Sequence, residues 1–370
     1  MTERDPVETS ADGTRDLYDV ATWEPRTALD RLATRAYRVG ISAARVVLVL
    51  LAVVVLLVQV VLGGLGATLV EDPYAIGLVV LSVVPALGLA AYIYAADVTT
   101  GEPLELLVGS YVLGVLFAGF AAVVNTLLSF VQIVPIVGLV VFFYLVVGPV
   151  EESVKLLAVR LYAYRDDRFD AVIDGAVYGA ASGLGFATIE NALYITRQLN
   201  ATAPGQEALA AVGAGGAAAW LVGSGVAQAG FAGSLQQIIA EGGQITTVRA
   251  LAGPGHVIYS AFAGYYLGLA KFNAENAGPI VAKGLIIAAF IHGTYNVLAG
   301  IVPGVVSIFF PGVPVIVLFF GFVLVYDGLF GYLLYRKLAR YRRVYHATRP
   351  EPETAVGKDE FEVARTEFEE

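Results

Sequence analysis

Residues 106–150 form a stretch of 45 residues without a single formally charged side chain. Such a stretch is more than long enough to cross a bilayer, because a helix needs only about 20 apolar residues to span the hydrocarbon core. Hydrophobic residues make up 57% of the chain and charged residues 15%, whereas soluble domains carry about a quarter charged residues. The sequence therefore predicts an all-α, polytopic transmembrane helical bundle.

Apolar runs separated by polar or charged segments predict eight membrane spans. They are expected at 46–70, 74–96, 104–132, 135–164, 171–196, 250–271, 279–300 and 313–336. The segment 201–248 is rich in glycine and alanine and only weakly hydrophobic. It forms a ninth span, a re-entrant segment or an outer loop.

The distribution of lysine and arginine predicts the orientation of these spans, because such residues favour the cytoplasmic side of short flanks. Basic clusters precede the first span, follow the fourth and follow the last. All three face the cytoplasm if 201–248 does not cross, which places both termini in the cytoplasm. We expect a transmembrane domain at 41–345, between polar, solvated cytoplasmic tails at 1–40 and 346–370.

Four of the later spans contain ionisable or amide side chains within their apolar sequence. Charged groups at membrane depth are costly, which makes each one a candidate functional residue. Glu151 and Glu152 end the uncharged stretch, and Lys155 follows one helical turn later. The other candidate residues in these spans are Glu190, Asn191, His256, His292 and Asn296.

The carboxylates and imidazoles are predicted to lie at one depth. Glu151, Glu190, His256 and His292 lie 13 to 16 residues from the inner ends of their spans, or roughly 20 to 24 Å at the α-helical rise. They would share a layer in the outer half of the membrane. Small residues at helical spacing line the same faces and allow close packing, which indicates an active site buried between helices. The three stripes are Gly175, Gly179 and Gly183; His256, Ser260, Gly264 and Gly268; and Gly284, Ala288, His292 and Asn296.

These side chains are suited to the activation of water. A buried glutamate can act as general base, or two histidines with one or two glutamates can hold Zn²⁺ and leave a position open for water. An asparagine or histidine could stabilise an oxyanion, and Lys155 is expected to pair with Glu151 at i+4. The chain has no cysteine, which excludes thiolate chemistry. The candidate metal ligands are Glu152, Glu190, His256 and His292.

Other functions remain open on these residues alone. An isolated intramembrane histidine is more often a packing residue than a ligand, and Glu152 with Lys155 could be a structural ion pair. A proton-coupled transporter or channel could use the carboxylate and histidine layer as a relay, although the inverted repeats common in transporters are not evident. A net charge of −9 argues against nucleic-acid binding.

The motifs resemble those of the PrsW family of intramembrane proteases. Glu151-Glu152-Ser-Val-Lys155 is similar to the family's EExxK motif, and Phe186-Ala-Thr-Ile-Glu190-Asn191 to its FxxxEN motif. His256, and His292 within His-Gly-Thr-Tyr-Asn296, resemble its two histidine-bearing helices. The resemblance covers roughly 135–300 and is interrupted by the insertion 201–248.

This resemblance implies an intramembrane endopeptidase of the cell membrane, related to the CAAX prenyl proteases and bacteriocin-processing enzymes. Its substrate would be a membrane-anchored protein, resembling an anti-sigma factor only by family analogy. Water would be activated by zinc or by a metal-free glutamate mechanism. The eight candidate residues named above would all be catalytic. Glu152 would be the base or a ligand, and Asn191 and Asn296 would be orienting or oxyanion groups.

Overall fold

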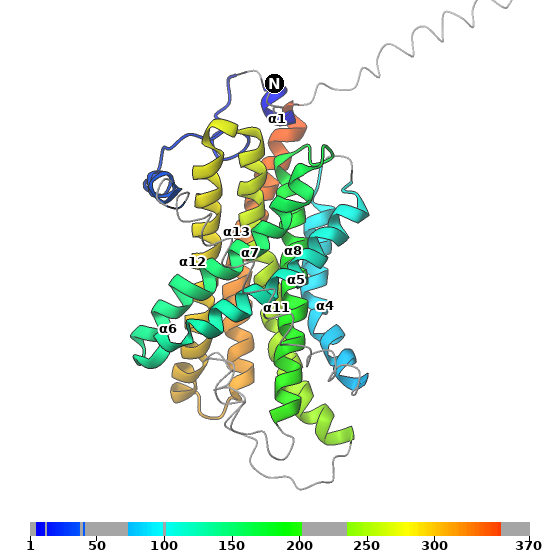
Figure 1. The fold of residues 1–370 in the computed structure, drawn as a ribbon, viewed down its shortest axis with the longest axis vertical. Coiled ribbons are helices and arrows are strands. Elements are labelled where there is room, and N and C mark those ends of the chain that lie inside the picture. The colour runs from blue at the N-terminus through cyan, green and yellow to red at the C-terminus, as the bar shows by residue number, and fades with distance from the viewer. Residues whose placement is uncertain are drawn as a thin grey trace, which may run out of the picture.

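The computed structural model describes residues 5–11, 13–37, 40, 73–98, 101–201 and 235–348. Apart from one isolated β-bridge near the N-terminus, its regular structure in these ranges is helical, which confirms the all-α prediction (Figure 1). The predicted span at 46–70 and residues 202–234 of the insertion lie outside the described ranges. The principal helices are α1 (Pro6–Thr9), α4 (Pro73–Ala95), α5 (Leu104–Leu127), α6 (Val137–Phe142), α7 (Gly148–Leu161), α8 (Val172–Ala201), α11 (Leu235–Phe272), α12 (Ala277–Phe309) and α13 (Val315–Thr348).

Six helical segments in the described ranges are long and apolar enough to cross a membrane. Each coincides with a predicted span, and together they make the chain a multi-pass membrane protein. The predicted span 250–271 lies within α11, which is not among the six. The six are Ala75–Ala95, Leu104–Leu127, Val137–Arg165, Val172–Thr196, Ala274–Phe309 and Val315–Thr348.

The centre of the bundle is the contact between α8 and α11, two of the predicted glycine-bearing helices (Figure 1). A Cβ atom on Gly179 would collide with the carbonyl oxygen of Ser260, and one on Gly264 with that of Gly175. The absence of side chains at these positions therefore allows the two backbones to touch. A Cβ atom on Gly183 would meet the carbonyl oxygen of His256, so the same contact fixes the position of that histidine along α8.

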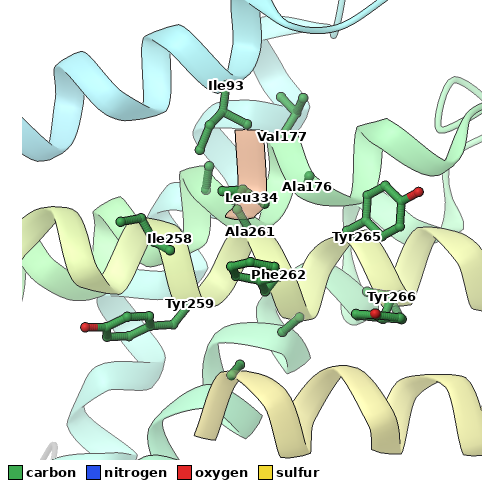
Figure 2. Close-up of a cluster of buried hydrophobic side chains, with 14 of the residues drawn as sticks. Ile93, Ala176, Val177, Ile258, Tyr259, Ala261, Phe262, Tyr265, Tyr266 and Leu334 are labelled. Atoms are coloured by element: carbon green, nitrogen blue, oxygen red, sulfur yellow. The ribbon is translucent and has the colours of Figure 1, made fainter. Parts of the chain in front are cut away.

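The apolar core is built around α11. Figure 2 shows how its side chains meet residues of three other helices. The labelled residues are Ile93 from α4, Ala176 and Val177 from α8, Leu334 from α13, and Ile258, Tyr259, Ala261, Phe262, Tyr265 and Tyr266 from α11 itself. This packing explains why α11 is central without being uniformly apolar, because protein and not lipid surrounds most of it.

The helix of the predicted fourth span changes from α- to π-helical hydrogen bonding just before its two glutamates. α6 is followed by a π-helical segment, η2 (Phe143–Val147), and then by α7 (Figure 1). Pro149 has no backbone N–H and removes one hydrogen bond from this helix, and π-helical turns are common at functional sites. A Cβ atom on Gly148 would collide with the carbonyl oxygen of Ala289 in α12. Glu151 and Glu152 therefore enter the bundle where α7 touches α12.

The N-terminal segment is packed against one end of the bundle, so the prediction of a solvated tail is wrong for much of residues 5–37. Val20 and Trp23 are buried, and the side chain of Asn273 in the loop after α11 accepts a hydrogen bond from the backbone of Trp23. Asp30 is fully buried and forms an ion pair with Lys283 of α12 at 2.8 Å. Polar residues order this segment through specific pairing, which mean composition does not reveal.

Candidate active site

Glu152 and Lys155 form the centre of a buried polar cluster. They lie one turn apart on α7, and Nζ of Lys155 donates to Oε1 of Glu152 at 2.7 Å. Glu152 is fully buried and Lys155 is 1% exposed. The ammonium also lies 4.2 Å from the ring centre of Phe186, a cation–π contact. Both charges are therefore neutralised within the protein.

Glu151 differs from its neighbour because one of its oxygens lacks a hydrogen-bond donor. Oε1 accepts a hydrogen bond from the amide of Asn125 in α5 at 3.0 Å. Oε2 is buried and has no hydrogen-bond partner, and it lies 3.9 Å from Nζ of Lys155. The pairing predicted between Glu151 and Lys155 is thus present but is longer than the pairing with Glu152.

His292 of α12 joins the two glutamates. Its Nδ1 lies 2.8 Å from Oε1 of Glu152, and its Nε2 lies 3.7 Å from Oε2 of Glu151. Because the Glu152 carboxylate only accepts hydrogen bonds, Nδ1 carries the imidazole proton. The lone pair on Nε2 then faces the unpartnered carboxylate oxygen of Glu151. Two acceptors facing each other in a buried site call for a proton donor or a cation between them.

His256 of α11 lies against His292, with ring centres 5.2 Å apart. Nζ of Lys155 donates to its Nδ1 at 2.9 Å, so Nε2 carries the proton and faces Oε2 of Glu190 at 2.7 Å. Glu190 of α8 is also bound by Nη2 of Arg249 at 2.6 Å. Residues from four predicted spans thus meet in one cluster, as expected if they lie at the same depth in the membrane.

Arg249 and Asn125 are parts of the cluster that the sequence analysis missed. Arg249 is 6% exposed on α11 and donates through Nε to Oδ1 of Asn191 at 2.8 Å. It is the only lysine or arginine between Arg197 and Lys271, and it lies two turns before His256. Asn125 is one of only two amides in the uncharged stretch. Their isolation in apolar sequence was the available signal.

The two predicted asparagines occupy different surroundings. Asn191 is fully buried, and its amide donates to Oγ of Ser82 in α4 at 3.0 Å. It connects α4, α8 and α11 and holds Arg249. Asn296 lies one turn beyond His292 and is half-buried, and none of the hydrogen bonds between described residues includes its side chain. The geometry thus gives Asn191 a positioning contact and leaves Asn296 at the margin of the cluster.

An aromatic layer extends the cluster towards α13. The ring of Tyr259 stacks on His292 with centres 5.2 Å apart and an interplanar angle of 29°. The Tyr259 hydroxyl donates to Oδ1 of the buried Asp327 at 3.3 Å. These contacts fix the plane of the His292 ring.

The cluster contains a set of atoms that fits a metal ion. One ligand atom each from Glu151, His256 and His292 lies within 4.8 Å of the others, and all three residues are buried. Zn²⁺ binds imidazole nitrogen and carboxylate oxygen at about 2.0–2.2 Å, so these three residues could share one ion after small shifts of their side chains. Glu152 is not one of these three residues. It orients the His292 ring by its contact with Nδ1, as the ring nitrogen of a ligand histidine that does not bind the metal commonly requires. The unpartnered oxygen of Glu151 is the observation that favours the fit.

Buried carboxylates and imidazoles within a multi-pass bundle are typical of membrane-embedded hydrolases. Residues 102–326, more than half of the chain, match the model of the PrsW family intramembrane metalloproteases, and the chain belongs to this family. It is accordingly a peptidase. The match includes Glu151, Glu152, Lys155, Glu190, Arg249, His256 and His292.

Individual relatives agree with the family assignment. Protease PrsW of Geobacillus kaustophilus is 27% identical over 220 residues, which cover 59% of this chain and 78% of the relative. Protease PrsW of Bacillus subtilis is 28% identical over 218 residues, which cover 58% of this chain and 78% of the relative. No solved structure matches the chain.

Proposed function

We propose that this chain hydrolyses a peptide bond of a membrane-anchored protein at the cluster formed by Glu151, His256 and His292. The observation that supports this proposal is the buried pair formed by Oε2 of Glu151 and Nε2 of His292, which lie 3.7 Å apart. A water beside this pair, within hydrogen-bond distance of both atoms, would donate to one acceptor and be aligned by the other. A general base must lie within hydrogen-bond reach of the proton that it removes.

Glu151, and not Glu152, is the base or ligand in this proposal. Oε2 of Glu151 is free to receive a proton, whereas Glu152 already accepts hydrogen bonds from Lys155 and His292. Glu152 then acts as a positioning residue that sets the tautomer of His292. The Lys155 ammonium, 3.9 Å from Oε2 of Glu151, favours negative charge that develops beside it.

The second histidine is positioned from α8 and α11. Glu190 accepts from Nε2 of His256 and from Arg249, so the ring is held on both of its nitrogens. If a metal such as zinc is bound, Glu151, His256 and His292 would hold it, and one ring nitrogen of His256 would exchange its present partner, Lys155 or Glu190, for the ion. Zinc bound there would lower the pKa of a bound water and polarise the scissile carbonyl. Asn296, at the margin of the cluster, is the candidate oxyanion group.

The site favours an extended peptide as substrate. Residues of α5, α7, α8, α11 and α12 enclose the cluster, and Glu151 is only 4% exposed. A transmembrane segment must therefore unwind locally to present a peptide bond to it. The proposed location is the cell membrane with both termini in the cytoplasm, and the substrate class is membrane-anchored proteins. A proton-coupled transporter is not favoured, because the family consists of proteases.

The experiment is cleavage of a panel of single-span membrane proteins by the purified chain in detergent micelles. The unmodified protein is compared with Glu151→Gln and with Glu105→Gln, an exposed carboxylate outside the cluster. Cleavage that Glu151→Gln abolishes and Glu105→Gln retains is expected. Equal cleavage by Glu151→Gln and the unmodified chain contradicts the proposal.

A second measurement tests the metal. We expect the purified protein to contain zinc and to lose cleavage in a chelator, with recovery on addition of Zn²⁺. Full activity of a metal-free preparation would favour direct activation of water by Glu151.

A further inference from the structure

A second group of carboxylates lies far from the active site, where α4 ends and α5 and α8 begin. Asp97 and Glu102 are in the connection between α4 and α5, and Asp174 is in the first turn of α8. One oxygen of each of these three residues lies within 4.8 Å of the others. Asp174 is 16 residues before Glu190 on the same helix, or roughly 24 Å along its axis. The two clusters are therefore separate.

Two oxygens of this group are buried without a hydrogen-bond donor. Glu102 is 4% exposed and Asp174 is fully buried. Oε2 of Glu102 accepts from the hydroxyl of Tyr178, and Oδ2 of Asp174 accepts from the backbone N–H groups of Asp170 and Ala171 at 2.8 Å each. Oε1 of Glu102 and Oδ1 of Asp174 have no such partner. A buried carboxylate oxygen without a partner is costly unless a proton or a cation reaches it.

No side-chain cation supplies this charge within the part of the chain that the structure describes. Arg168, which is close to Asp174 in sequence, pairs instead with Glu105 and Asp166, and its own side chain is exposed. None of the ion pairs between described residues includes Glu102 or Asp174. Burial, together with nearby carboxylates, raises the pKa of Glu102 to about 7. Near neutral pH, either a proton or a bound cation must offset the negative charge of this group.

We propose that Asp97, Glu102 and Asp174 bind a hard divalent cation of the Mg²⁺ or Ca²⁺ class. All the available donors are carboxylate oxygens, which such ions prefer, and no imidazole is present in the group to select a softer metal. The two unpartnered oxygens are the ligand atoms that the protein itself leaves unsatisfied. The ion would join the α4–α5 connection to the start of α8, the helix that carries Glu190.

Binding of Mn²⁺ to the purified full-length chain tests this proposal, with Mg²⁺ and Ca²⁺ as competitors. The measurements use a Glu151→Gln, His292→Gln background, so that the active-site cluster does not contribute. We expect one Mn²⁺ to be displaced by Mg²⁺ or Ca²⁺. Glu102→Gln and Asp174→Asn should each weaken binding more than tenfold. Glu105→Gln removes an exposed carboxylate from the same end of the protein, and it should bind as the background does.

A thermal unfolding series keeps the test informative if Asp174→Asn folds poorly. Ca²⁺ should raise the melting temperature of the background protein and of Glu105→Gln, and it should leave that of Glu102→Gln unchanged, because a ligand of the folded state stabilises it by mass action. Two results would overturn the proposal. One is the absence of Mn²⁺ binding at millimolar concentration, which means that protons alone balance the cluster. The other is unchanged binding in both cluster variants.

Discussion

Nδ1 of His292 lies 2.8 Å from Oε1 of Glu152, and Nε2 of the same ring lies 3.7 Å from Oε2 of Glu151. The two adjacent glutamates thus contact opposite sides of one imidazole. Glu152 fixes the proton on Nδ1, and Glu151 faces the free lone pair. This division gives the two carboxylates different contributions to cleavage, although their chemistry is the same.

Glu151→Gln should lower the rate of cleavage more than Glu152→Gln. Loss of a general base typically costs about 10²–10⁴-fold in rate, whereas loss of a residue that orients a ligand or a base costs about 10–100-fold. The measurement is kcat on one membrane-anchored substrate, with thermal unfolding of each variant as the control for folding. A larger loss of kcat in a well-folded Glu152→Gln would assign the base to Glu152 instead.

Arg249→Met should reduce cleavage about 10–100-fold, because the guanidinium holds both Glu190 and Asn191. Arg249→Lys should recover part of this loss, since lysine keeps the charge but cannot reproduce two directed hydrogen bonds. The protein's affinity for zinc is the second readout, and Arg249→Met should weaken it by displacing His256. The matched control is Arg160→Met, which removes an exposed arginine of α7 that lies over the ring of Tyr164. Unchanged cleavage and zinc affinity in Arg249→Met would show that the arginine has no positioning role.

Gly179→Ala should destabilise the protein and reduce cleavage. The added Cβ would collide with the backbone of Ser260 in α11, and overpacking of this kind costs about 1–3 kcal/mol. Separation of α8 from α11 would also move His256 away from Glu190. Gly119→Ala on α5 is the control, because no atom lies within 4 Å of its added Cβ. Thermal unfolding and cleavage of both variants test this prediction, and equal behaviour of the two would contradict it.

Asp30 should stabilise the folded protein at neutral pH and lose this effect in acid. Burial opposes ionisation, but the Lys283 ammonium and the hydrogen bonds from Tyr18 and Thr27 hold the pKa of Asp30 below its usual value of 3.8. A carboxyl whose pKa is lower in the folded state contributes stability above pH 3.8, and this contribution decreases as the pH falls towards the folded-state pKa.

The test of Asp30 compares melting temperatures of the unmodified chain and Asp30→Asn across pH. The difference should be largest near neutral pH and should shrink below pH 3.8. Asp16→Asn, an exposed carboxylate in the same segment, is the control and should have a much smaller effect. A difference between the unmodified chain and Asp30→Asn that does not vary with pH would show that Asp30 acts through packing alone.

Membrane spans and the identity of most cluster residues could be predicted from the sequence, whereas the pairings could not. Helical spacing suggested Glu151 as the partner of Lys155, but the shorter contact is to Glu152. The reason is that His256 and Phe186, from α11 and α8, also contact the ammonium and fix its position. Contacts between distant helices thus outweigh the i+4 geometry within one helix.

The residues that the sequence analysis missed share a cause. Arg249 and Asn125 fall outside the resembling motifs, and each joins the cluster only through a partner far away in sequence. The N-terminal segment was misjudged for a similar reason. Its polar composition is typical of a solvated tail, yet Asp19 and Asp30 pair with lysines on α12 and α13. Composition averages over residues and does not register such specific pairs.

The sequence by itself determined that the chain crosses a membrane with helices and that carboxylates and imidazoles lie at one depth in four of them. Both results follow from local quantities, namely the hydrophobicity of each residue and the fixed rise of a helix. Only the tertiary structure decided which oxygen stays unpaired and which nitrogen carries a proton. Those outcomes depend on the distances between helices, and glycine contacts such as that of Gly179 with Ser260 set these distances.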